Sequence, residues 1–102
     1  MEVTTTMVVF ELQQRQFETQ TDKAVLILLY NEQGEEAAKE WVPLSKIEFE
    51  QKDGSDTYDV IMPKWLYYKK DVLPACTQVK REFVITTYAD KYELLAAARN
   101  VQ

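Results

Sequence analysis

Residues 47–62 read IEFEQKDGSDTYDVIM, and this stretch decides the fold. Apolar residues alternate with glutamates before a polar run centred on the Asp-Gly pair at 53–54, and Tyr58, Val60 and Met62 occupy alternate positions after it. Such a pair between two alternating segments is a strong hairpin signal, because glycine accepts the positive φ that tight turns need. The pattern therefore predicts an antiparallel hairpin with Tyr58, Val60 and Met62 on one face of its second strand.

Two further strands are predicted upstream of this hairpin. Residues 3–12 are rich in β-branched side chains, and Val8, Phe10 and Leu12 share one face. Residues 23–30 are apolar on both alternations, and at this length between polar turns they fit a central strand better than a helix. The polar segment between the two is predicted either as a loop or as an exposed continuation of the first strand.

The chain then turns at Gly34 and returns as a strand at about residues 39–42. This strand is expected to stop at Pro43, because proline cannot donate a hydrogen bond to a sheet. Residues 79–88 are predicted to form another strand, and a helix over residues 76–84 is the alternative.

Two helices are predicted in the second half of the chain. Pro63 suits the first position of a helix, where its missing N–H costs nothing. Apolar residues recur at helical spacing from there to Pro74, which predicts a helix at about 63–73. A capping-box pattern at residues 90–93 comes before an apolar stripe, which predicts a helix at about 91–101.

Together these elements predict an α+β fold. We expect a twisted, mainly antiparallel sheet of five or six strands with the two helices packed against it. The chain has 102 residues and shows no linker, internal repeat or low-complexity tract. Residues 1–102 are therefore predicted to form a single globular domain.

The composition excludes several kinds of chemistry. The chain has no histidine, one cysteine (Cys76) and two glycines. It therefore lacks a histidine-ligated metal site, a histidine-activated nucleophile, an intramolecular disulfide and a glycine-rich phosphate loop. No pair of carboxylates stands in the context of a metal or acid–base site. We expect no cofactor, no metal and no enzymatic activity.

Charge and hydropathy indicate the compartment. The net charge of −5 is not that of a general nucleic-acid or membrane binder. Residues 1–4 show neither the basic nor the apolar region of a signal peptide. The longest apolar run, residues 24–30, is far shorter than the ~20 residues that span a bilayer. With a lone cysteine, the sequence predicts a soluble cytoplasmic protein that does not associate with membranes.

Three segments within residues 23–66 resemble a known pattern. They read KAVL at 23–26, WVPLSKI at 41–47 and IMPKWL at 61–66. Their order is similar to the K-A-V-L, W-[IV]-P-x-S-x-I, V-P-x-W-L pattern of small proteins carried by phages and other mobile elements, most of which have no assigned activity. Met62 and Lys64 depart from it, at positions where valine and an acidic residue are common. The resemblance implies a phage-like origin, hence the host cell cytoplasm, and assigns no catalytic residue.

The physical interpretation of these segments is mostly structural. Trp41 is predicted to be a core aromatic residue that closes one end of the sheet, with ligand stacking as the alternative. Ser45 is expected to bond its own backbone, because no base is present beside it to activate its hydroxyl. Trp65 and Leu66 are predicted to face inward and to dock the first helix onto the hairpin.

The first candidate partner-binding surface is aromatic and basic, and it lies on the first predicted helix. Tyrosines beside lysines suit both the stacking of nucleic-acid bases and a protein-binding hot spot. The alternative is an ordinary amphipathic helix with core aromatics and extended lysines. The candidate residues are Trp65, Tyr67, Tyr68, Lys69 and Lys70.

The second candidate surface is acidic. Glu32, Glu35 and Glu36 surround the predicted turn at Gly34. At a loop tip, these carboxylates would meet an arginine-rich surface, including one that normally holds nucleic acid. A solvated turn without a partner is the alternative.

These observations favour a non-enzymatic, phage-like protein that binds and inhibits a host macromolecular complex. A defence nuclease is one example, which would make the protein an anti-defence or anti-CRISPR protein. A small sheet-based module that binds single-stranded nucleic acid is the alternative. An enzyme is the least favoured functional class. Separately, pairing of exposed sheet edges between two copies of the chain would give a homodimer.

Overall fold

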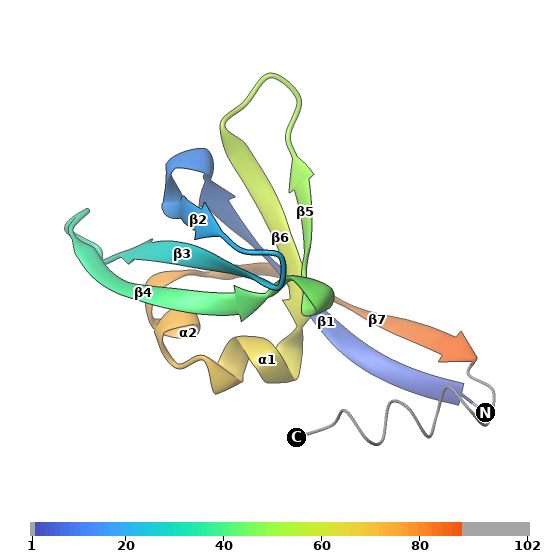
Figure 1. The fold of residues 1–102 in the computed structure, drawn as a ribbon. Helices are drawn as coiled ribbons and strands as arrows, with labels where there is room; N and C mark the ends of the chain where they lie inside the picture. The colour runs from blue at the N-terminus through green and yellow to red at the C-terminus, as the bar shows by residue number, and fades with distance from the viewer. Residues whose placement is uncertain (1, 89–102) are drawn as a thin grey trace.

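Four strands form the larger of two sheets in the computed structural model, which describes residues 2–88 (Figure 1). They are β1 (Glu2–Gln13), β5 (Glu48–Gln51), β6 (Thr57–Pro63) and β7 (Val79–Tyr88). Their order across the sheet is β5-β6-β1-β7, and each neighbouring pair is antiparallel. The β-branched N-terminal segment thus becomes a central strand with a neighbour on each side.

Three strands form the second sheet, in the order β2-β3-β4. They are β2 (Phe17–Gln20), β3 (Ala24–Tyr30) and β4 (Glu36–Pro43). Short 3₁₀ turns connect the two sheets, η1 (Gln14–Gln16) from β1 to β2 and η2 (Leu44–Lys46) from β4 to β5. β4 ends at Pro43 as predicted, because a proline has no N–H to continue the ladder.

The core lies between the inner faces of the two sheets. The predicted set on β1 is confirmed, because Val8, Phe10 and Leu12 are all buried in one apolar cluster. β6 extends the wall of β1 within the same sheet, β3 and β4 form the opposite wall, and two short helices, α1 (Lys64–Lys69) and α2 (Val72–Cys76), also contribute. These further buried members are Val25, Ile27, Leu29, Val42, Ile47, Val60, Met62, Leu66, Tyr67 and Leu73.

The predicted hairpin over residues 47–62 is confirmed as β5 and β6. Phe49 pairs with Val60 and Gln51 with Tyr58, so side chains alternate between the core and the outside. Gly54 has a φ of +67° in the connecting turn, which is the backbone conformation that favours glycine. Residues 76–88, for which a helix was the alternative, contain the strand β7.

The first predicted helix is two helices rather than one. Instead of a continuous run over 63–73, α1 ends before Lys70, whose ψ of +80° is not helical. α2 then begins at Val72 and includes Pro74, which was expected to end the helix. Pro74 is the third residue of α2, where a backbone N–H has no partner within the helix, so its missing N–H breaks no hydrogen bond.

Two further differences concern the number and extent of elements. The predicted single sheet of five or six strands is wrong, because seven strands are divided between two sheets across residues 2–88. The polar segment after β1 contains both η1 and β2, so it is neither a simple loop nor a continuation of one strand. The predicted helix at 91–101 lies outside the described residues.

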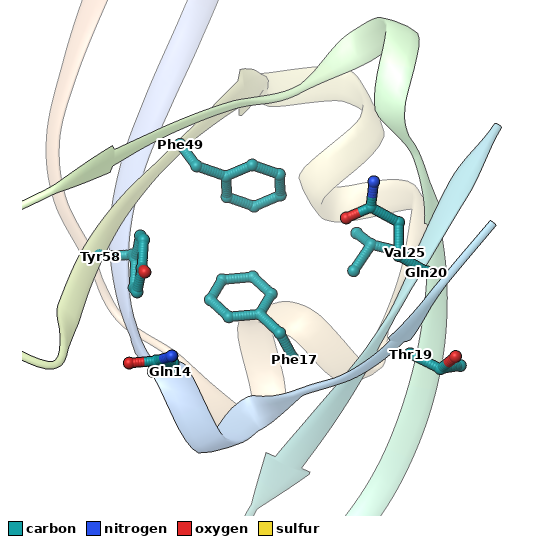
Figure 2. Close-up of a pocket in the computed structure, with 7 residues that line it drawn as sticks. All are labelled: Gln14, Phe17, Thr19, Gln20, Val25, Phe49 and Tyr58. Atoms are coloured by element: carbon teal, nitrogen blue, oxygen red, sulfur yellow. The ribbon is translucent and has the colours of Figure 1, made fainter. Parts of the chain in front are cut away.

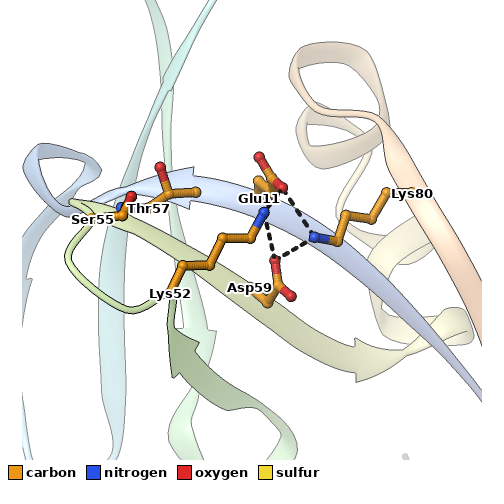
Figure 3. A network of polar contacts seen from close by, with 6 residues as sticks. All are labelled: Glu11, Lys52, Ser55, Thr57, Asp59 and Lys80. Carbon is orange, nitrogen blue, oxygen red and sulfur yellow. Dashed lines mark hydrogen bonds and ion pairs between the residues drawn. The ribbon is translucent and has the colours of Figure 1, made fainter.

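An ionic network ties the outer side of the larger sheet together (Figure 3). Glu11 on β1 lies directly opposite Asp59 on β6, which would place two like charges side by side. Lys80 sits at a bulge in β7, and its Nζ lies 2.9 Å from Glu11 Oε1 and 2.7 Å from Asp59 Oδ1. Lys52 also bonds Glu11. The two lysines therefore neutralise the carboxylate pair.

Acidification is expected to weaken this network. The hydrogen bonds from Lys52, and then from Lys80, lower the pKa of Glu11. A carboxyl whose folded pKa is lowered stabilises the fold above its unfolded pKa, and this contribution is lost as the pH falls through the folded pKa. Glu11→Gln should therefore lower the Tm at about pH 7, and the difference from wild type should shrink towards about pH 3.

The measurement is thermal unfolding followed by circular dichroism across this pH range. Glu32→Gln, which removes an exposed carboxylate from outside the network, is the matched control and should change the Tm little at any pH. A Tm difference between Glu11→Gln and wild type that stays constant with pH would contradict the assignment.

Candidate functional site

Helix α1 presents an aromatic surface to solvent. Trp65 is 53% exposed, Tyr68 is 49% exposed and Lys69 is also exposed. Their spacing of three and four residues places them on one side of the helix. We call these three residues the α1 patch. Three of the five predicted members of the aromatic and basic surface are therefore accessible together.

The predicted inward orientation of Trp65 is wrong, and Tyr67 takes its place in the core. Tyr67 is buried, with its ring centroid 5.1 Å from that of Phe10. Its hydroxyl lies 2.8 Å from Thr77 Oγ1, and burial raises its pKa. Because the chain breaks at Lys70, the apolar residues before and after the break do not share one helical phase. Leu66 and Tyr67, not Trp65, face the core.

Lys70 and Lys64 are engaged in ion pairs. Lys70 Nζ lies 3.0 Å from Glu40 Oε1, which connects the end of α1 to β4. Lys64 Nζ lies 3.2 Å from Glu82 on β7. Within the described residues, Lys69 makes no such pair. The positive charge predicted for this surface is therefore smaller than the sequence indicates.

The acidic turn forms as predicted at the tip of the β3–β4 hairpin. Asn31 holds it, because its side-chain Oδ1 accepts hydrogen bonds from the backbone N–H groups of Gln33 and Glu35, at 3.0 and 2.9 Å. Gly34 has a φ of +79°. All three predicted carboxylates are exposed, namely those of Glu32, Glu35 and Glu36. We call these three residues the acidic turn.

A partly apolar surface lies on the same hairpin. Residues 23–30 contain the predicted central strand, because β3 lies between β2 and β4, but only alternate side chains of β3 join the core. Leu26 and Leu28 are half-buried and lie on the other face, opposite Trp41 and Lys39 of β4. We call these four residues the outer hairpin face.

Trp41 is a surface residue rather than the predicted core aromatic. It is 45% exposed, because Val42, its neighbour along β4, takes the inward position. Lys39 forms a charged border beside it, with Nζ 3.0 Å from Glu18 and 3.8 Å from Glu36. The sequence signal for the outer hairpin face was the second apolar alternation of residues 23–30. This alternation indicates a second apolar face on the strand, whether or not another element covers it.

A cleft opens between the two sheets on their β2 and β5 sides (Figure 2). Phe17 is at its centre and makes edge-on contacts with Phe49 and Tyr58, at ring-centroid distances of 5.1 and 5.4 Å. The volume of the cleft is about 420 Å³. Phe17 is the one large apolar residue of the polar segment 13–22, and local sequence could not reveal the cleft because the partners of Phe17 come from distant strands. The remaining lining residues are Gln14, Thr19, Gln20 and Val25.

The far edge of the larger sheet is formed by β7. Lys80, Arg81 and Glu82 protect the first part of this strand, whereas Val84 and Ile85 are exposed. Self-pairing of two copies along such an edge stays a prediction.

The described residues bring the acidic turn and the outer hairpin face together, because both belong to the β3–β4 hairpin. No ion pair or hydrogen bond within residues 2–88 joins the α1 patch to the acidic turn.

Among the described residues, no helix is long and apolar enough to cross a membrane. Nor do three or more potential metal ligands lie grouped together there.

No family model, curated protein or solved structure matches this chain.

The contrast between Tyr67 and Trp65 gives a direct stability test. Tyr67→Ala removes a buried ring and should cost about 3–5 kcal/mol of the free energy of unfolding. Trp65→Ala changes an exposed side chain and should stay within about 0.5 kcal/mol. Urea unfolding of both variants measures the difference. Equal losses would show that Trp65, and not Tyr67 alone, packs in the core.

Proposed function

We propose that this protein acts by binding a host macromolecule, without catalysing a reaction, and that the outer hairpin face is its contact surface. The observation that carries the proposal is the exposure of Trp41 directly opposite Leu26 on a sheet face. Tryptophan in an apolar setting with a charged border is typical of the residues that dominate binding energy at protein interfaces.

The charge of the hairpin supports a basic partner. The acidic turn continues the outer hairpin face at the hairpin tip, and the chain carries a net charge of −5. Complementary charge speeds association and selects the partner, while the apolar centre supplies affinity. A basic protein surface with an apolar patch fits both features.

A basic surface of this kind is often one that holds nucleic acid, so its occupation would be inhibitory. We infer that the protein covers such a surface on a host complex, for example a defence nuclease. This would make it a phage-encoded anti-defence protein that acts in the host cytoplasm. The resemblance of residues 23–66 to proteins of phages and mobile elements supports this interpretation.

Trp41→Ala should abolish partner capture. Tagged wild-type protein is expected to retain a stoichiometric partner from host lysate at physiological salt. Loss of a central tryptophan costs 2 kcal/mol or more at many interfaces, so retention should fall by about thirtyfold or more.

Trp65→Ala is the matched control, because it removes a similarly exposed tryptophan from the α1 patch. It should retain the partner at the wild-type level. Glu32→Gln combined with Glu35→Gln should slow association, with a weaker effect at high salt. Full retention by Trp41→Ala would refute the proposed contact surface.

The second candidate function is binding of single-stranded nucleic acid by the α1 patch. Its support is the exposure of Trp65, Tyr68 and Lys69 on one side of a helix. Aromatic side chains stack bases, and lysine neutralises phosphate. The ion pairs of Lys64 and Lys70 reduce the charge available for this role and make it the weaker proposal.

Titration of a labelled single-stranded oligonucleotide at two salt concentrations tests this second function. Binding should strengthen as salt falls, and Trp65→Ala should weaken it by about tenfold, in keeping with the 1–3 kcal/mol that stacking contributes per base. The absence of binding at low salt would eliminate it.

A further inference from the structure

The mouth of the cleft lies between two strands that each have one side unpaired within residues 2–88. β2 is the last strand on one side of its sheet, and β5 is the last strand of the other sheet. Figure 2 shows Phe17 of β2 and Phe49 of β5 pointing into the space between them. The cleft is therefore bordered by backbone groups that can accept an additional strand.

A bulge in β2 turns two side chains to the same side. Phe17 pairs with Ile27 and Gln20 with Val25, whereas the pairing shifts between Phe17 and Thr19. Residues three apart in a regular strand would face opposite ways. Because Ile27 and Val25 are both buried on the inner face, the shift places Phe17 and Gln20 on that face together.

The residues that line the cleft favour the binding of an uncharged aromatic group. Phe17, Phe49 and Tyr58 supply aromatic walls that meet edge to face. Gln14 and Gln20 supply side-chain amides, and none of the seven lining residues is charged. An aromatic side chain gains apolar contact there and can satisfy a polar edge through the amides.

The face of β5 that points away from the cleft carries two carboxylates. Glu48 and Glu50 flank Phe49 and are exposed on the outer side of the sheet. Glu50 lies opposite Asp59, which in turn lies opposite Glu11. Lys52 and Lys80 neutralise the inner two of these three carboxylates, and within the described residues Glu50 has no cation. A basic side chain on an added strand would complete this row.

We propose that β5 binds an extended peptide as an additional strand. The peptide places an aromatic side chain beside Phe49 in the cleft, and a basic side chain on either side of it, next to Glu48 and Glu50. The recognised pattern is therefore basic, aromatic, basic. The carboxylates on this edge would repel phosphates, which favours a peptide over a nucleic acid. This site uses neither the outer hairpin face nor the acidic turn.

The probe is the peptide acetyl-Thr-Lys-Trp-Lys-Thr-amide, titrated into ¹⁵N-labelled protein and followed by NMR. We expect saturable shifts of the backbone amides of residues 48–51 and of the side-chain amide of Gln20. The same peptide with alanine in place of tryptophan should bind about tenfold more weakly, because the aromatic contact is lost. The version with glutamate in place of both lysines should also bind at least about tenfold more weakly at low salt.

A charge reversal in the protein separates this site from the hairpin surfaces. Glu48→Lys combined with Glu50→Lys should reverse the preference and favour the glutamate peptide. Glu32→Lys combined with Glu35→Lys is the matched control and should leave the preference unchanged. Because all four positions are exposed, both variants should keep the wild-type spectrum elsewhere.

Three results would overturn the proposal. They are the absence of saturable shifts, shifts confined to β3, β4 or β7, and equal binding of the lysine and glutamate peptides. Shifts confined to β3 or β4 would place the peptide on the hairpin instead, and the outer hairpin face is tested separately by Trp41→Ala.

Discussion

Burial of the inner faces of β1 and β3 in a shared core is the constraint on which the rest of the structure depends. Val8, Phe10 and Leu12 lie in the same cluster as Val25, Ile27 and Leu29, and the helices and remaining strands complete that cluster. Strand geometry sends every second side chain away from this contact. The surfaces with functional interest are those outward alternations, including Leu26 and Trp41, together with the cleft left open between the sheets.

Local periodicity was sufficient to predict most strands but not how the sheets divide. The alternation in residues 47–62 specifies a hairpin by itself, since both strands and the turn are contiguous. Residues 23–30 show what local periodicity cannot determine. A strand that is apolar on both alternations looks buried on both faces, whereas here one face meets the core and the other meets solvent. The difference depends on which strands pair, and pairing is a long-range property.

The candidate sites show the same limit on a smaller scale. The acidic turn was predictable because Asn31, Gly34 and the glutamates act within one turn. The orientation of α1 was not predictable, since a break at Lys70 changes the helical phase. Tyr67 rather than Trp65 therefore lies in the core. The cleft around Phe17 also escaped prediction, because its aromatic partners come from strands more than thirty residues away in the chain.

The pairing of β1 with β7 has a consequence for how the chain folds. Glu2 lies opposite Tyr88, and β7 continues along β1 as far as Phe10 (Figure 1). β1 is therefore synthesised well before β7 and must wait for it before both of its sides are paired. Contacts so distant in sequence slow folding, and the larger sheet can be completed only after β7 has been synthesised. Until then, one side of β1 is unpaired, so the nascent chain can pair wrongly along that edge or be bound there by chaperones.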